Sequence, residues 1–168
     1  MKAGIKISRG LYLKMLDDLR RPHKFAYERV GFLSAKHGNR SGGHQLVLLT
    51  DYYPVPDDQY IDDPGSGARI NSAAIRAAMQ RVLDSGDGAF HVHLHDHCGK
   101  PGFGEMDQEE IPRVVSGLRV AGPAAPHGML LLSANHATAW VWLPGLSEPV
   151  TASRISVVGF PMAFFDQE

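Results

Sequence analysis

The order of helical and strand-like segments along the chain predicts a single α/β domain, in which a mixed β-sheet is flanked by helices. Apolar residues recur at helical spacing over residues 8–20 and 72–85, and a third helix is expected over residues 107–118. Between and after these helices lie short segments rich in branched and aromatic residues, which is the pattern of strands. The chain has 168 residues, enough to bury one core, and residues 1–168 are expected to form one domain.

Local signals support each predicted element. Ser8 is a suitable N-cap for the first helix, Arg21-Pro22 ends that helix, and Gly86 stops the second one. Strands are expected over residues 25–34, 44–52, 91–97, 129–134, 137–143 and 155–160. A polar loop over residues 54–67 contains three prolines, and loops of this length inside compact domains usually have a function.

Composition and charge exclude several classes of protein. The chain has 17 Lys and Arg residues against 18 Asp and Glu residues, which argues against a protein that grips phosphate backbones, so no nucleic-acid partner is expected. Cys98 is the only cysteine, so there is no disulfide framework. The N-terminal residues lack the apolar core of a signal peptide, and no window has the roughly 20 apolar residues of a membrane span. A cytoplasmic protein with no membrane partner is expected.

Four of the nine histidines fall within seven residues, at positions 91, 93, 95 and 97. Successive side chains of a strand point to opposite faces, so these four imidazoles share one face if the strand is regular. Each neutral imidazole has a donor and an acceptor that must be satisfied when buried, and a divalent metal meets this need because imidazole nitrogen is a preferred zinc ligand. The alternative is an exposed edge strand with solvated histidines, or weak adventitious metal binding.

A catalytic zinc site needs a third protein ligand from another element. Asp107 has a suitable position: it comes twelve residues after His95, beyond a loop rich in glycine, where a helix is expected to begin. A carboxylate at this position is also favoured by the helix dipole. The alternative role for Asp107 is that of an ordinary helix cap.

Two segments together resemble the JAB/MPN metalloproteases of the JAMM type. Residues 90–107 contain an H-x-H pair, a loop and an aspartate, as in that family's H-x-H, loop, S-x-x-D signature. Upstream, residues 28–33 have the sequence E-R-V-G-F-L, similar to the family's E-x-x-G-x-L pattern. The resemblance, which is to the bacterial deubiquitinase-like branch, implies a JAB/MPN-like (cytidine-deaminase-like) fold. It also implies that His93, His95 and Asp107 bind Zn²⁺ and that Glu28 is the general acid/base.

The same resemblance implies an activity, with one departure at the site. Family members hydrolyse peptide or isopeptide bonds after the C-terminus of ubiquitin or a ubiquitin-like protein, with a zinc-activated water as nucleophile, in precursor processing or deconjugation. E1-like or E2-like proteins of the same pathway would be further partners. The family has serine three residues before the aspartate, whereas this chain has Gly104. Loss of one oxyanion donor costs on the order of 10²–10³ in rate elsewhere. Gly104 and His97 are candidates for contact with substrate.

The acidic residues of the long loop and the departure at Gly104 allow other interpretations. Aspartates at 51, 57, 58, 62 and 63 could meet the basic tail of a modifier, or could form a simple solvated acidic loop. A catalytically weak or inactive MPN-like scaffold or binding module is the alternative function. The chain has no H-E-x-x-H, no paired C-x-x-C, no G-x-S-x-G and no Walker A loop.

Overall fold

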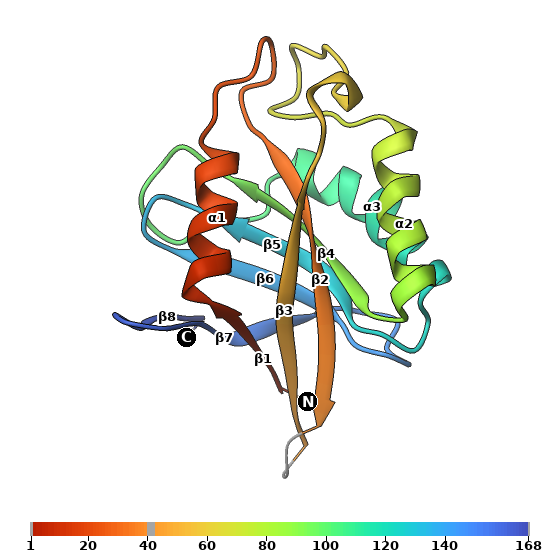
Figure 1. Cartoon of the computed structure of the whole chain (residues 1–168), viewed down its shortest axis with the longest axis vertical. Coiled ribbons are helices and arrows are strands. Elements are labelled where there is room, and N and C mark those ends of the chain that lie inside the picture. Colours follow the sequence, from red (N-terminus) through yellow and green to blue (C-terminus); the bar gives the residue numbers. More distant parts are fainter. Residues whose placement is uncertain (1, 40–42, 168) are drawn as a thin grey trace.

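The computed structural model describes residues 2–39 and 43–167, apart from the side chains of residues 39, 105–108, 110 and 111. In chain order the elements are β1 (Lys2–Ser8), α1 (Arg9–Leu19), β2 (Val30–Asn39), β3 (His44–Pro54), the short 3₁₀ helix η1 (Asp57–Gln59), α2 (Ser72–Ser85), β4 (Gly88–Leu94), α3 (Glu105–Ala121), β5 (His127–Leu132), β6 (Ala137–Trp142), β7 (Val150–Val158) and β8 (Ala163–Asp166). Figure 1 shows α2 and α3 on one side of the strands and α1 on the other.

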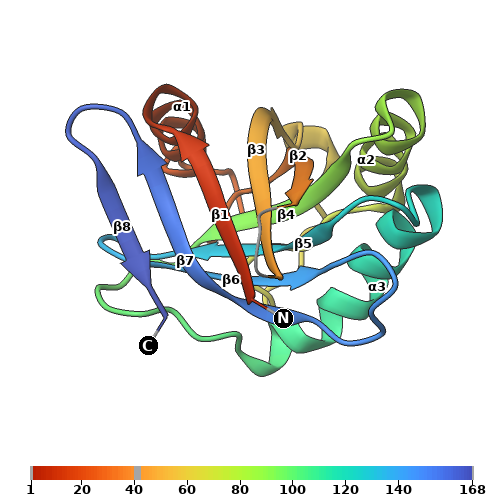
Figure 2. The same ribbon diagram turned by 90° about the horizontal axis from the view of Figure 1, so that it is seen from below.

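The sheet closes on itself. Its strand order is β1-β3-β2-β4-β5-β6-β7-β8, and β7 also pairs with β1. Seven strands therefore form a ring, and β8 is joined to that ring through β7 alone. In Figure 2, β1 lies between β3 and β7. Ile5 of β1 pairs in parallel with Val47 on one side and with Ile155 on the other.

The predicted fold, a JAB/MPN-like mixed β-sheet flanked by helices, is therefore wrong: the sheet is a closed ring of seven strands. The closing strand β1 falls in residues 2–8, which were not predicted to form a strand. Both of its pairings join segments far apart in the sequence, and local periodicity carries no information about such partners. The ring follows from these two long-range pairings.

The inside of the ring is filled by one apolar cluster. Every strand of the ring contributes a buried residue to it: Ala3, Leu33, Val47, Phe90, Leu130, Ala139 and Ile155. Helix α1 adds its buried face, made of Met15, Leu16 and Leu19. The opposite face of β2 carries Val30 and Phe32, which pack in a second cluster with residues of α2 and α3. One face of β2 and β4 is thus covered by the apolar cluster inside the ring, and the other face by α2 and α3.

The predicted starts and ends of the first two helices are confirmed. The Ser8 hydroxyl accepts a hydrogen bond from the backbone N–H of Leu11, and Asn71 caps α2 in the same way. Gly86 ends α2 with a φ of 72°, in the left-handed region that favours glycine. The strand predicted over residues 25–34 begins only at Val30, and strand β8 was not predicted. Over the described residues, no helix is long and apolar enough to cross a membrane.

Candidate metal centre

The register between β2 and β4 brings Glu28 to the histidines. These strands are antiparallel, with Val30 opposite His93 and Phe32 opposite His91. Extending this register by two residues places Glu28 opposite His95. The backbone of His95 still follows the sheet, because its N–H donates to the carbonyl of Leu132 at 2.9 Å.

The strand predicted over residues 91–97 ends at Leu94, so only His91 and His93 lie on β4, where they share a face as predicted. The rings of His95 and His97 continue the row beyond the end of the strand. Consecutive ring centroids are separated by 5.6, 5.0 and 5.6 Å, from His91 through His93 and His95 to His97. The first two rings are buried, and His91 meets the edge of Phe32. The side chain of His95 is 20% exposed, and His97 is exposed. Exposure to solvent thus increases along the run, from the buried His91 and His93 to His97.

Glu28, His93 and His95 form a compact cluster of possible metal ligands. One ligand atom from each lies within 4.8 Å of the other two. The Nε2 atoms of His93 and His95 are 3.1 Å apart, and Oε1 of Glu28 is 3.8 Å from Nε2 of His95. Two nitrogens bound to one tetrahedral zinc at 2.0–2.1 Å would be separated by about 3.3 Å. The donor set and its spacing therefore fit zinc.

The remaining predicted site residues lie around the loop that follows the histidines. Asp107 belongs to the first turn of α3, and its side chain lies outside the described residues, so its role as third ligand stays a prediction. Gly104 is exposed and directly precedes α3. The ring of Phe103 stacks on Trp140 at 4.3 Å and ties this loop to β6. His97 contacts His95 and lies near the carbonyl of Cys98.

The long loop between β3 and α2 holds Glu28 in place, a role that its sequence does not predict. The backbone N–H groups of Tyr27 and Glu28 both donate to the carbonyl of Gly67, at 2.9 and 3.0 Å. A Cβ atom at Gly67 would lie 2.9 Å from both Cδ and Oε2 of Glu28, closer than real Cβ contacts allow. The only sequence signal for this contact is a glycine in an unusually long loop. Gly67 leaves the space that the Glu28 carboxylate occupies.

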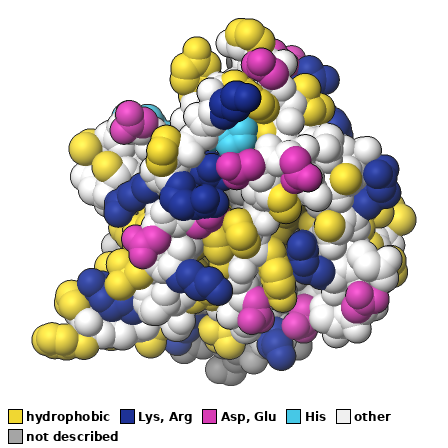
Figure 3. Space-filling view, turned by 45° about the horizontal axis from the view of Figure 1, so that its top comes forward, with side chains coloured by type: hydrophobic (Ala, Val, Ile, Leu, Met, Phe, Trp, Pro, Cys, Tyr) yellow, Lys and Arg dark blue, Asp and Glu magenta, His cyan; other side chains and the backbone are white. Residues whose placement is uncertain are grey.

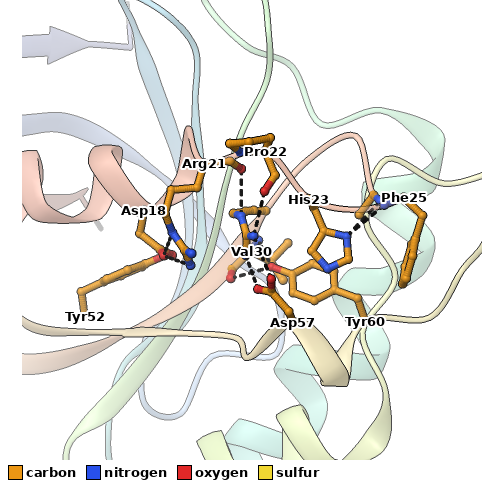
Figure 4. A network of polar contacts seen from close by, with 11 residues as sticks. Asp18, Arg21, Pro22, His23, Phe25, Val30, Tyr52, Asp57 and Tyr60 are labelled. Atoms are coloured by element: carbon orange, nitrogen blue, oxygen red, sulfur yellow. Dashed lines mark hydrogen bonds and ion pairs between the residues drawn. The ribbon is translucent and has the colours of Figure 1, made fainter.

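Next to Glu28, Arg29 is the centre of a polar network that joins Arg21, Pro22 and Asp57. Figure 4 shows these three residues and their neighbours. Its side chain is 2% exposed. Nη1 of Arg29 donates to Oδ1 of Asp57 at 2.7 Å, and the other nitrogens donate to the carbonyls of Arg21 and Pro22. The hydrogen bond from Arg29 lowers the pKa of the Asp57 carboxyl below its usual range. This network fastens η1 to the segment that carries Glu28.

A second part of the network connects α1 to β3 and to the segment that follows α1. The hydroxyl of Tyr52 donates to Asp18 at 2.6 Å, and Arg21 forms an ion pair with the same carboxylate. Burial and this hydrogen bond raise the pKa of Tyr52, so the phenol stays protonated. The backbone N–H of Val30 donates to the hydroxyl of Tyr60 at 2.9 Å. The segment between α1 and β2 is thereby fixed from several directions.

Glu28 and His95 line a groove of about 480 Å³. Its walls include the end of α1, the segment over residues 20–29, and residues 94–96. Figure 3, which brings the top of the molecule forward, shows acidic, basic and histidine side chains close together on this face. A substrate could therefore approach the cluster from solvent.

The acidic loop is partly neutralised within the molecule. Asp57 is paired with Arg29, and Asp63 with Arg69 at 2.8 Å. The pKa of Asp63 is lowered by that hydrogen bond. The other three aspartates of the predicted acidic surface, Asp51, Asp58 and Asp62, are exposed, as is the paired Asp57. The charges of Asp57 and Asp63 are matched by arginines, which leaves Asp51, Asp58 and Asp62 as the better candidates to attract a basic tail.

Comparison with known proteins does not place the chain in a family. No family model matches it, and no curated protein does. Among solved structures, it is similar to one described as the Trichoplax adhaerens STIL N-terminal domain, with 12% sequence identity and a TM-score of 0.42. The match covers 94% of this chain and 46% of that chain, so this chain spans less than half of that length. A likeness this weak supports no conclusion about function.

Proposed function

We propose that this protein is a zinc-dependent hydrolase of peptide or isopeptide bonds. The observation that carries the proposal is the meeting of two imidazoles and one carboxylate, within 4.8 Å, beside a groove of about 480 Å³. His93 lies on β4 opposite Val30 of β2, and Glu28 and His95 lie just beyond the paired ends of these two strands. Convergent titratable groups in a cleft are a general mark of catalytic sites.

His93 and His95 would hold the metal through their Nε2 atoms, with Asp107 as the expected third ligand. When bound, zinc lowers the pKa of a water ligand to about 7 and polarises a substrate carbonyl. Because His93 is buried against the sheet and His95 is partly exposed, the side of the cluster toward the groove is where substrate would enter.

Glu28 would act as the general acid/base. Its carboxylate would accept a proton from the attacking water as the oxygen bonds to the carbonyl carbon. It would then give this proton to the amine nitrogen as the C–N bond breaks. At 3.8 Å from His95, the carboxylate is near the ligand set, and the backbone contacts with Gly67 fix its approach.

The proposed substrate is a ubiquitin-like protein, cut after its C-terminus. This part rests on the resemblance of residues 28–33 and 90–107 to the JAMM motifs. An extended C-terminal tail suits an open groove beside a sheet. E1-like or E2-like proteins would then be partners in the same pathway.

A scaffold without catalysis is the second candidate, favoured by Gly104. This residue stands where the family motif has a serine, and it brings no side-chain donor for an oxyanion. In that case the contact of 3.1 Å between His93 and His95 would be a structural hydrogen bond. The two candidates differ in whether metal-loaded protein turns over substrate.

The test compares Glu28→Gln with a matched carboxylate variant, Asp96→Asn, in cleavage of a ubiquitin-like fusion. Asp96 lines the same groove and is exposed. We expect Glu28→Gln to retain zinc and to lose turnover by about 10²–10⁴, the range for a general acid/base, while Asp96→Asn keeps most activity. A chelator should abolish cleavage. Zinc-loaded wild type without turnover would favour the scaffold, and wild type that binds no zinc would end the hydrolase proposal.

A further inference from the structure

We propose that a second site, on the outer face of strands β3, β1 and β7, binds the phosphoryl group of a small organic phosphate. The site is a hollow of about 440 Å³. It lies toward the N-terminal end of β1, which Figure 1 places at the opposite end of the molecule from the segment between α1 and β2. The site is therefore separate from the candidate metal centre, and this proposal does not depend on the proposed hydrolysis.

Strand alternation creates the hollow. Ala3, Ile5 and Ile7 are buried inside the ring, so Lys2, Gly4 and Lys6 face outward. Glycine between two lysines leaves a gap on this face. A Cβ atom at Gly4 would meet nothing closer than the carbonyl oxygen of Arg154, at 3.9 Å. The floor of the hollow is thus the backbone of β1.

The neighbouring strands add polar groups to this floor. Gly4 pairs with Arg154 and Lys6 pairs with Ser156 on β7. On the other side, Lys2 pairs with His44 of β3. Lys2, Lys6, Arg154, His44 and Ser156 all line the hollow. Donors from three strands therefore converge on one concave space.

The hollow is positively charged, although the chain as a whole is not. Lys2, Lys6 and Arg154 contribute three positive charges, and Asp166 contributes one negative charge. The whole chain has a formal net charge of −1. Nε of Arg154 donates to Asp166 at 2.5 Å, and the guanidinium lies over the ring of Phe164, 5.5 Å from its centroid. These two contacts place the guanidinium beside the hollow.

A phosphoryl group fits this arrangement better than a single carboxylate. Its several oxygens can accept hydrogen bonds from both lysines, from Arg154 and from the Ser156 hydroxyl at once. The volume lies within the range of sites for small molecules. Two lysines and an arginine around one hollow also differ from the long basic stripe that a nucleic acid requires.

The experiment measures binding of pyrophosphate and of inorganic phosphate to the full chain by calorimetry and by amide chemical shifts. We expect pyrophosphate to bind more tightly than phosphate and to shift the resonances of β1 and β7. Lys6→Ala should weaken pyrophosphate binding about tenfold, the effect of losing one charge-assisted hydrogen bond. Lys14→Ala, which removes an exposed lysine of α1, should leave binding unchanged.

Gly4→Val provides a second variant that keeps every charge. Valine suits a strand but fills the hollow, so we expect binding to be lost while the unfolding temperature stays near that of the wild type. Equal binding by Lys6→Ala and Lys14→Ala, or undiminished binding by Gly4→Val, would overturn the proposal. So would tighter binding of a single-stranded oligonucleotide than of pyrophosphate, because that would indicate a nucleic-acid surface.

Discussion

Glu28 and Arg29 are neighbours in the sequence, yet their side chains belong to two very different polar regions. The guanidinium of Arg29 is 2% exposed and is enclosed by two carbonyls and the Asp57 carboxylate. The Glu28 side chain is 26% exposed and faces His95 beside an open groove. In the region around Arg29, groups of the protein itself pair with the buried charge. In the region around Glu28, possible ligand atoms lie close together at a place that a metal and a substrate can reach.

The charged groups around Arg29 stabilise the fold, whereas those around Glu28 are placed to bind a metal and a substrate. A buried charge must be matched by internal partners, and removing one of them is costly. A partly exposed cluster contributes less to stability, so its residues can be changed with less harm to the fold. Substitutions in the two regions should therefore affect different measurements.

The largest expected effect on stability is that of Arg29→Ala. This change leaves the carbonyls of Arg21 and Pro22 without their donor and opens a cavity, so we expect a loss of about 3 kcal/mol in the free energy of unfolding. Chemical denaturation measures this loss. The control is Arg69→Ala, which removes an exposed ion pair and should cost much less. Equal losses for both variants would show that the network around Arg29 is not a stabilising centre.

In the open region, His95→Ala should affect metal binding instead of the fold. We expect zinc affinity to fall about 100-fold or more, because changing a residue that only hydrogen-bonds to a metal ligand already costs about 10–100-fold, and His95 is itself a proposed ligand. A competition titration with a chromophoric chelator measures the affinity. His97→Ala is the matched control, since it removes the next imidazole of the run, whose ring centroid lies 5.6 Å from that of His95. Equal affinities in the two variants would exclude His95 as a ligand.

Gly67→Ala tests whether the loop over Glu28 links the two regions. The added methyl group would press on the carboxylate, so we expect turnover to fall about tenfold with zinc content unchanged, as for a small misplacement of a catalytic group. Gly102→Ala is the control, because a Cβ atom there would meet nothing within 4 Å.

A second measurement on Gly67→Ala does not depend on activity. In metal-free protein with ¹³C-labelled glutamate, the chemical shift of the Glu28 carboxyl carbon should differ from its wild-type value in Gly67→Ala and equal it in Gly102→Ala. No change in either turnover or this chemical shift would remove Gly67 from its positioning role.

The smallest effect is a pH dependence of stability from His127. Its Nδ1 accepts a hydrogen bond from the backbone N–H of Ala89, and its Nε2 donates to the carbonyl of Gly122. Burial lowers the pKa of His127 below its ordinary value of 6.5. The unfolded chain therefore binds a proton first as the pH falls, and stability decreases below about pH 6.5, by at most about 1.4 kcal/mol per pH unit. Above that pH the contribution is complete.

His127→Gln isolates this contribution. Glutamine has both a donor and an acceptor but does not titrate in this range. We expect the difference in unfolding free energy between pH 7.5 and about pH 5.5 to be smaller in the variant than in the wild type. If the variant keeps the wild-type pH dependence, other groups account for it.

Several features of this protein are determined by the sequence alone. The ends of α1 and α2 follow from Ser8, Asn71 and Gly86, because capping depends on contacts within a few residues. The common face of His91 and His93 on β4 follows in the same way from the alternation of a strand. These properties are local, so a short stretch of sequence contains all the information they need.

The tertiary structure alone decided the closure of the sheet and the surroundings of Glu28. Closure depends on β1 pairing with both β3 and β7, and the position of Glu28 depends on Gly67 and on Arg29 reaching Asp57. Each of these contacts joins segments that many residues separate. These contacts stabilise the protein only when the whole chain is compact. Periodicity and local propensity depend on neighbouring residues alone, so they do not predict such contacts.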